Sequence, residues 1–339
     1  MNNVLINLAL TGLALSHILG KTWLRGDGID WVASNVIDSI VRFALPMLLI
    51  EAGRVAKKTY KNGDADTFFR DRTVDLTPFV IALVLFLAAY PRYDGASFDF
   101  EIASLLFSPA YPFYWAPIVI CYFIITPWLI SLDSSSIGRW ALLSFAVFWI
   151  VCVILIPIPH IYFQSSFGTL ILNLINNRMV LKLSGFFLFG LYIDRILQWL
   201  DRSPLSRKIK KINQITMLCA LIVTLAVPFL EWCFYVSPWD HSWRDYVRPN
   251  VAVFGVTAYV EWAFLTQKGS LQWLKSKKMN DAVLGLYLAH SFFIELFVAW
   301  TPALPLIGMI FKTGLIVLLG FGFGWLYRQL IRLIMTDKW

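Results

Sequence analysis

Charged residues are scarce in this sequence, and so are cysteines. Only 15% of the 339 residues are Asp, Glu, Lys or Arg, whereas 58% are apolar. A soluble domain carries about 25% charged and about 45–50% apolar residues. Together with a mean hydropathy of +0.67, this composition excludes a soluble globular protein and indicates a chain used mostly for membrane-spanning segments.

The few cysteines indicate neither a disulfide framework nor a metal site. All lie in apolar runs and none form a Cys-x-x-Cys motif; they are Cys121, Cys152, Cys219 and Cys233. Isolated thiols fit neither chemistry, so we expect no metal. The start also lacks the basic stretch of a cleavable signal. With no linker, repeat or low-complexity tract in view, we expect one membrane-embedded domain over residues 1–339 and no separate soluble domain.

Long apolar runs are what the sequence has instead. A helix needs about 20 residues to cross the ~30 Å hydrocarbon core. Backbone groups in lipid must be satisfied within the protein, so the expected fold is an all-α bundle of about ten transmembrane helices. The candidate spans are residues 4–19, 32–52, 76–90, 115–132, 139–157, 180–193, 215–236, 251–265, 282–300 and 306–326.

The net charge of +8 is distributed unevenly across these spans. Twenty Lys and Arg residues fall in loops on the side of the N-terminus and seven on the other side. This bias, with an even number of spans, predicts that both termini are cytoplasmic. Because the basic residues lie between spans, we expect them to meet anionic lipid headgroups or a phosphate-bearing substrate, and we expect no nucleic acid partner.

Several ionisable residues lie inside the expected spans, where they are costly and become candidates for a functional site. Asp38 and Arg42 are four positions apart and share one helical face. They are either an internal ion pair or a site where Arg42 faces a cavity that holds an anionic or carbonyl group. His290 lies within the ninth span, where it could hydrogen-bond a neighbouring helix.

His17 is the only titratable side chain among the first twenty residues. It lies at the outer end of the first span, and Asp27 and Asp30 follow in the next loop as carboxylates that could orient it. A neutral imidazole can take a proton from a hydroxyl near neutral pH. From the residues alone, His17 is either a general base or a buried polar group with a partner.

Six short motifs are spread over nearly the whole chain. They are Leu13-Ala-Leu-Ser-His17, Arg42-Phe-Ala-Leu-Pro46, a basic loop ending in Phe68-Phe-Arg-Asp-Arg72, Thr126-Pro127, Phe186-Phe-Leu-Phe-Gly190 and Leu284-Gly-Leu-Tyr-Leu-Ala-His290. In this order they resemble the acyltransferase-3 family of integral membrane O-acyltransferases. Asn7 stands where that family usually has an arginine, and Pro112 where it often has a histidine.

The resemblance implies an acetyl-CoA-dependent O-acyltransferase of the bacterial inner (plasma) membrane. An acyl group, most often acetyl, would pass from cytoplasmic acyl-CoA to a hydroxyl of a surface polysaccharide or lipid-linked oligosaccharide. The implied catalytic residues are His17, as general base, and Arg42, which would hold the thioester oxygen or the pantetheine.

The implied substrate-binding residues lie both in the spans and in the inner loops. Clustered Lys and Arg side chains favour phosphate groups, so the basic ones would meet the phosphates of CoA. The same residues could instead serve only to set the topology. The set consists of Asp38, His290, Arg54, Lys57, Lys58, Arg70 and Arg72.

Two other classes of protein stay open at this point. Ten spans with internal charges could form a transporter or translocase of a lipid-linked sugar or a small anion, although no matched pair of Gly/Pro-broken segments indicates inverted repeats. The departures at Asn7 and Pro112 would suit a catalytically silent relative. A homo-oligomer also stays open, because lipid-facing and partner-facing apolar surfaces have similar compositions.

Overall fold

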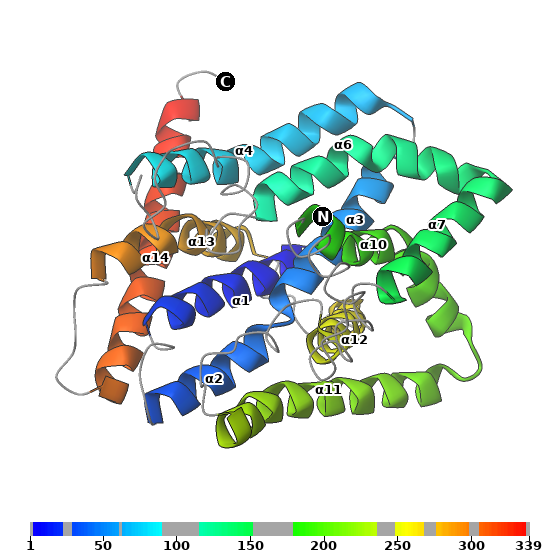
Figure 1. The fold of residues 1–339 in the computed structure, drawn as a ribbon. Helices are drawn as coiled ribbons and strands as arrows, with labels where there is room; N and C mark the ends of the chain where they lie inside the picture. The colour runs from blue at the N-terminus through cyan, green and yellow to red at the C-terminus, as the bar shows by residue number, and fades with distance from the viewer. Residues whose placement is uncertain are drawn as a thin grey trace. The chain divides into compact units, whose positions relative to one another are not determined.

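The computed structural model describes residues 3–22, 29–60, 63–89, 115–151, 179–235, 248–267, 276–297 and 305–336. Within these ranges the chain is helical apart from short turns and contains no β-strand (Figure 1). The all-α class expected from the sequence is therefore confirmed. Its physical cause is that a helix satisfies its own backbone groups without water.

The helices differ widely in length. In chain order they are α1 (Asn3–Thr22), α2 (Ile29–Val41), α3 (Ala44–Thr59), α4 (Ala65–Ala89), α6 (Trp115–Ser134), α7 (Ser136–Trp149), α10 (Met179–Arg202), α11 (Ser206–Tyr235), α12 (Pro249–Gln267), α13 (Lys277–Phe297) and α14 (Pro305–Thr336). Among the described residues, three segments are long and apolar enough to cross a membrane: Trp115–Ser134, Ser206–Ala226 and Ile310–Tyr327. The count of ten crossings and the cytoplasmic termini stay predictions.

The chain divides into two compact units. The first contains Met1–Leu48, Asn213–Arg244 and Phe254–Trp339, and the second contains Leu49–Ile212 and Asp245–Val253. Three of the four boundaries between them fall inside α3, α11 and α12, and the fourth, between Arg244 and Asp245, lies outside the described residues. The single domain over residues 1–339 stays a prediction.

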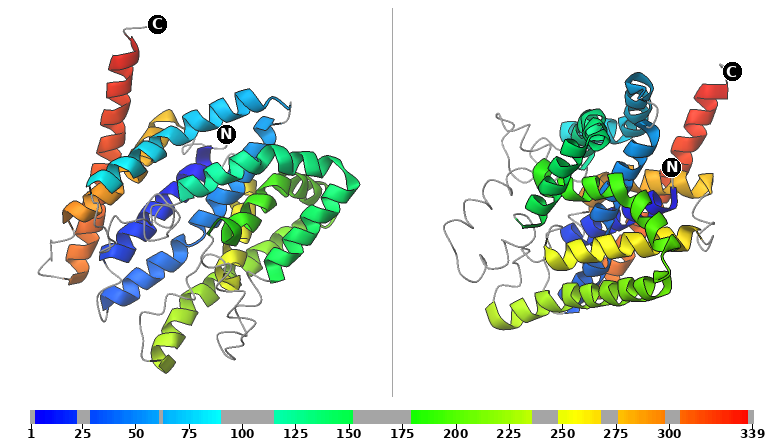
Figure 2. Two further views of the ribbon diagram at one scale, coloured as in Figure 1. Left: turned by 45° about the horizontal axis from the view of Figure 1, so that its top comes forward. Right: turned by 90° about the vertical axis from the view of Figure 1, so that its right-hand side faces the viewer.

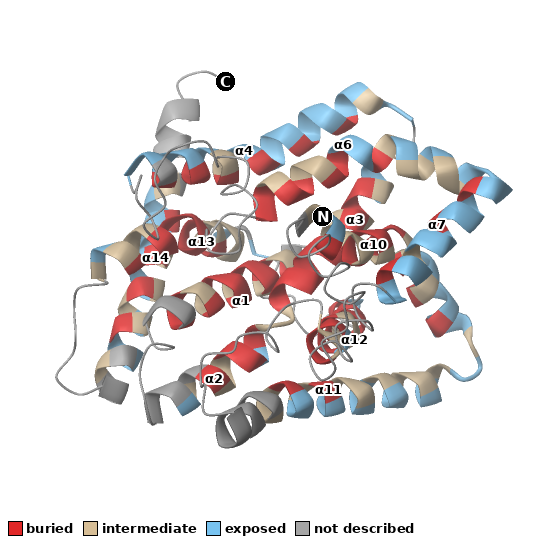
Figure 3. Ribbon diagram, in the orientation of Figure 1, coloured by how far each residue is buried: buried red, intermediate tan, exposed pale blue. Residues whose placement is uncertain are grey.

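In the first unit, α1 lies between α2 and α13, and α14 packs against α13 (Figures 1 and 2). The α1 helix is buried along most of its length (Figure 3). Its sequence is apolar on nearly all sides, which is the pattern of a helix enclosed by others. Hence a polar side chain on α1 faces protein in most directions.

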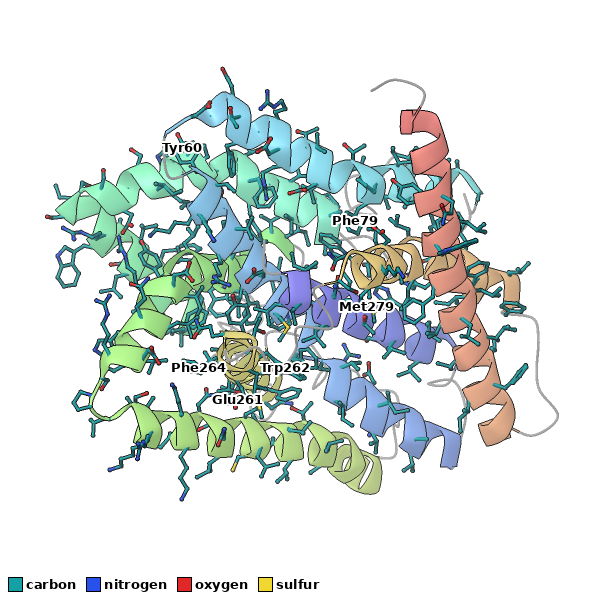
Figure 4. The ribbon with its side chains drawn as sticks, turned by 180° about the vertical axis from the view of Figure 1, so that it is seen from behind. Tyr60, Phe79, Glu261, Trp262, Phe264 and Met279 are labelled. Atoms are coloured by element: carbon teal, nitrogen blue, oxygen red, sulfur yellow. The ribbon has the colours of Figure 1, made fainter. Side chains whose placement is uncertain are left out.

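The α11 and α12 helices also pack together within the first unit. Ala220 of α11 lies in one apolar cluster with Phe254 and Ala258 of α12. Figure 4 labels Glu261 and Trp262 on α12: Glu261 accepts a hydrogen bond of 2.9 Å from Gln214 of α11, and the Trp262 ring packs in the same cluster. This cluster also includes Phe43, from the turn that follows α2.

The second expected span, residues 32–52, is wrong as one continuous helix. The structure ends α2 at Val41 and begins α3 at Ala44, with a turn at Arg42 and Phe43. Pro46 explains the break, because a proline has no N–H to donate to the carbonyl four residues earlier and its ring clashes with that carbonyl. In the first turn of α3, where N–H groups have no intrahelical partner, the same proline is tolerated.

In the second unit, α3 and α10 approach each other at two glycines. A Cβ added to Gly53 would collide with the carbonyl oxygen of Phe187, and one added to Gly190 would collide with that of Ile50. Small residues at a membrane helix crossing let the backbones come this close. The glycine of the Phe186–Gly190 motif is therefore required by packing.

Two helices of the second unit begin with side-chain caps. Asp64 Oδ1 accepts a 3.0 Å hydrogen bond from the backbone N–H of Thr67 at the start of α4. Hydrogen bonds from Thr67 lower the pKa of the Asp64 carboxyl. Ser135 Oγ likewise accepts from the Gly138 N–H at the start of α7. Each cap satisfies an N–H that has no partner in its own helix.

The contact between α13 and α14 gives a test of the packing. A Cβ on Gly324 would collide with the carbonyl of Asp281 and lie 3.0 Å from Cα of Gly285, whereas one on Gly322 would meet nothing within 4 Å. We expect Gly324→Val to destabilise the protein by about 1–3 kcal/mol through overpacking. Gly322→Val, on the same helix, is the matched control and should unfold at the wild-type temperature. Thermal unfolding of the purified protein in detergent measures both, and equal midpoints would contradict the close contact.

Candidate functional site

His17 on α1 contacts His290 on α13. The Nδ1 atom of His17 lies 3.0 Å from Nε2 of His290. The two ring planes are nearly parallel, inclined by 13°, with centroids 5.3 Å apart. These two histidines came from different motifs of the sequence, and the structure brings them together in the first unit.

The hydrogen bonds of His290 determine which of its nitrogens carries the proton. The side chain is buried with no exposed surface, and its Nδ1 atom lies 2.5 Å from the carbonyl oxygen of Tyr287. A carbonyl only accepts, so Nδ1 of His290 donates. In the neutral ring Nε2 then carries the lone pair and accepts from His17 Nδ1–H and from the hydroxyl of Ser291, which is 3.1 Å away.

The same chain of hydrogen bonds determines the state of His17. Because its Nδ1–H donates to His290, the neutral ring of His17 carries its lone pair on Nε2. The side chain is half-buried, in contrast to His290. His17 is thus oriented by a ring nitrogen of His290. Imidazoles that act as bases are commonly held by such a partner on their other nitrogen.

Asp38 and Arg42 form a buried ion pair beside the same turn of α1. Arg42 donates from Nε and Nη2 to Asp38 Oδ2, at 2.9 and 2.6 Å. Ser16, the neighbour of His17, donates to the other oxygen of Asp38 at 2.8 Å. The Asp38 side chain has no exposed surface and that of Arg42 is 14% exposed. The ion-pair interpretation is confirmed, and Asp38 also fixes the plane of the guanidinium.

The break between α2 and α3 places Arg42 outside a regular helix. Its backbone N–H donates to the backbone carbonyl of Ser39 at 3.4 Å, and α3 starts two residues after Arg42. Ser39 in turn donates through its hydroxyl to the backbone carbonyl of Thr224 on α11, at 3.2 Å. The turn that carries Arg42 is therefore held between α1 and α11.

A second contact shows that α1 and α13 are aligned along their length. Asn7 donates to the side-chain oxygen of Asn280 at 2.5 Å. This bond and the one between His17 and His290 both join residues 273 positions apart. Two contacts with one offset require parallel helices in a single register. Asn7, where an arginine was expected from the resemblance, thus contributes to this alignment.

The five basic residues expected to meet CoA lie in the second unit and fall into two groups. Three are held by carboxylates: Arg54 by Asp194 and Glu51, Lys57 by Asp133, and Arg72 by Asp75, at N–O distances between 2.7 and 3.5 Å. The other two, Lys58 and Arg70, are exposed. Arg70 comes no closer than 3.8 Å to the oxygen of Asp71 with which it pairs.

Sequence reasoning missed Asp133, which directly follows the fourth expected span. Its carboxylate accepts from Lys57 at 2.9 Å and from the hydroxyl of Tyr192 at 3.0 Å, and Arg195 lies 3.3 Å away. The signal available was a single acid at the end of an otherwise apolar run. Asp27, proposed as an orienting carboxylate, and Pro112 lie outside the described residues, as does the side chain of Asp30.

The family model described as an acyltransferase domain matches residues 8–328. The matched range includes His17, the Asp38–Arg42 pair and His290, and it confirms the resemblance drawn from the six motifs. No curated protein and no solved structure matches the chain.

The buried ion pair is the part of this site most open to a stability test. Asp38→Asn leaves the Arg42 charge without its buried counterion. The loss of one partner of such a pair costs about 3–5 kcal/mol. We expect Asp38→Asn to lower the unfolding temperature in detergent, and Asp38→Asn combined with Arg42→Gln to recover part of the loss.

Ser16→Ala serves as the control, since it removes one neutral donor to Asp38 and leaves both charges in place. A double variant no more stable than Asp38→Asn alone would show that the two charges do not compensate each other.

Proposed function

Since the chain belongs to the acyltransferase-3 family of membrane acyltransferases, we propose that it transfers an acyl group from cytoplasmic acyl-CoA to a hydroxyl of a surface polysaccharide or lipid-linked oligosaccharide. Acetyl is the proposed acyl group, and the bacterial inner (plasma) membrane the proposed location. The observation that carries the proposal is a half-buried imidazole whose Nδ1 is occupied by a hydrogen bond and whose Nε2 holds the lone pair.

The proposed reaction is a direct transfer. Nε2 of His17 takes the proton of the acceptor hydroxyl while that oxygen attacks the thioester carbonyl carbon. The new C–O bond forms, the C–S bond breaks, and the thiolate of CoA leaves. The thiolate then takes the proton from the His17 imidazolium, which gives free CoA thiol and restores the neutral base. A positioned general base of this kind contributes about 10²–10⁴-fold to the rate.

Arg42 is the proposed electrostatic partner of the reaction. Negative charge develops on the thioester oxygen as the hydroxyl attacks, and a preorganised guanidinium in a water-poor site stabilises such charge. The two hydrogen bonds from Arg42 to Asp38 Oδ2 support this role, because they hold the guanidinium in one orientation before substrate arrives. Ser16 supports it further by fixing Asp38 from α1.

For the phosphates of CoA, we propose Lys58 and Arg70 as the first contacts. Both side chains are exposed, and neither loses a close carboxylate when it binds an anion. Arg54, Lys57 and Arg72 are already neutralised by carboxylates at hydrogen-bonding distance. They would join a phosphate contact only by exchanging those partners. The contacts of Arg54 and Lys57 favour a role in holding α3, α6 and α10 together, and that of Arg72 lies within α4.

The role of His17 is tested by acyl transfer in membranes that contain the wild type or His17→Ala. We expect the variant to lose at least about 100-fold in rate, because the general base is gone. Thr11→Ala, a polar-to-alanine change on the same helix, is the matched control and should retain transfer. Incorporation of label from acetyl-CoA into surface polysaccharide measures the rate, with equal protein amounts in each membrane. Full transfer by His17→Ala would refute the mechanism.

The CoA contacts are tested by binding of the detergent-purified protein to immobilised CoA. Hydrogen bonds to charged groups contribute about 1.5–3 kcal/mol each, so Lys58→Ala combined with Arg70→Ala should weaken binding by at least about tenfold. Arg207→Ala with Lys208→Ala removes the same charge from exposed positions on α11 and should leave the affinity unchanged. Equal affinities for the two double variants would return Lys58 and Arg70 to a role in topology.

A further inference from the structure

We infer that His290 is a positioning residue, which fixes the tautomer and the ring orientation of His17 so that Nε2 is the basic nitrogen. The family resemblance implied a substrate-binding role for His290. This inference deepens the proposed function and rests on it for its catalytic consequence, although the tautomer of His17 can be measured without any activity.

The contacts of His290 use both of its ring nitrogens within the protein. Nδ1 donates to the carbonyl of Tyr287, and Nε2 accepts from His17 and from Ser291. The side chain has no exposed surface. A residue that binds substrate directly needs a polar atom directed at the ligand, and His290 directs both of its nitrogens at its own chain.

The lone pair on Nε2 of His290 excludes the other tautomer of His17. Either nitrogen of a neutral imidazole can carry the proton. If His17 carried it on Nε2, the lone pair on its Nδ1 would face the lone pair on His290 Nε2 across 3.0 Å. Two acceptors at that distance repel each other, so the proton of His17 belongs on Nδ1. The lone pair that can remove a proton is then on Nε2.

The packing around the pair holds it in this geometry. Ile18, next to His17, lies in one apolar cluster with Ile294 of α13 and Ile316 of α14. The Asn7–Asn280 bond fixes the same offset of α1 against α13 at the other end of α1. The two helices cannot slide along each other without breaking these contacts. The packing of α13 against α1 therefore keeps His290 next to His17.

As positive charge develops on His17 during proton transfer, its Nδ1–H becomes a better donor, and the bond to His290 strengthens. In serine hydrolases a carboxylate receives the corresponding N–H and holds the tautomer of the base. Here an imidazole, itself anchored by a backbone carbonyl, occupies that place. A neutral acceptor has the advantage that no isolated charge needs to be buried beside the base.

The direct test is the tautomer of His17 in the full-length protein. The chain has four histidines, so ¹⁵N spectra of histidine-labelled protein in lipid can be assigned by single substitutions. We expect His17 to be protonated at Nδ1 in the wild type and in His290→Gln, whose carboxamide oxygen can accept from Nδ1. In His290→Leu we expect the Nε2-protonated form to appear. A wild-type His17 protonated at Nε2 would overturn the inference.

The kinetic test separates positioning from packing. At metal sites, partners that orient a ligating imidazole through its second nitrogen contribute about 10–100-fold. By the same physical effect, His290→Leu should lower kcat by at least about tenfold with KM for acyl-CoA unchanged. His290→Gln should recover most of kcat. His290→Asn, whose carboxamide is too short to reach the place of Nε2, should not. Equal kcat for the Gln and Leu variants would overturn the positioning role.

Thermal unfolding of each variant shows whether it folds. If His290→Leu does not fold, the comparison of His290→Gln with His290→Asn provides the test. The two failures remain distinguishable. A protein that has the expected tautomer and transfers no acyl group would refute the proposed function. A transferase whose His17 is protonated at Nε2 would refute the role of His290 and the choice of Nε2 as the base, and would leave the acyl transfer itself standing.

Discussion

A polar group inside a bilayer must find its partner within the protein, because no water is present to take that place. The candidate site follows from this constraint. Asp38 is neutralised by Arg42 and accepts a hydrogen bond from Ser16. The ring nitrogens of His290 form hydrogen bonds with Tyr287, Ser291 and His17. Each partner that balances a buried group also restricts its orientation. The requirement for satisfied polar groups therefore produces a preorganised arrangement of the kind that a transferase needs.

Much of the site could be predicted from the sequence, since a polar residue in an apolar run is conspicuous. His17, Asp38, Arg42 and His290 were all found in this way, and the spacing of four between Asp38 and Arg42 indicated their ion pair as one of two alternatives. The contact between the two histidines was not predicted, although a bond from His290 to some neighbouring helix was. It depends on the parallel register of α1 and α13, and such long-range registers leave no local pattern in a single sequence.

For the fold, likewise, the general class could be predicted and some details could not. Composition and the length of the apolar runs gave the all-α class, because the bilayer permits few alternatives. The break at Arg42 and Phe43 was missed, since Pro46 was interpreted as part of a motif and not as the first turn of a new helix. Asp133 was missed because a single acid at the end of a span usually faces water. The five basic residues expected to meet CoA all lie in the second unit, and local spacing does not reveal which of them meet a carboxylate.

The contact between α1 and α13 also determines when during its synthesis the chain can form the site. The first unit is assembled from both ends of the sequence, and residues 49–212 are synthesised between them. At about 5–20 residues per second, the 273 residues that separate His17 from His290 take roughly 14–55 seconds to translate. Throughout this interval His17 is already made and its partner does not exist. A chain released early by the ribosome therefore lacks the pair altogether, and competence for chemistry arrives only with nearly complete synthesis.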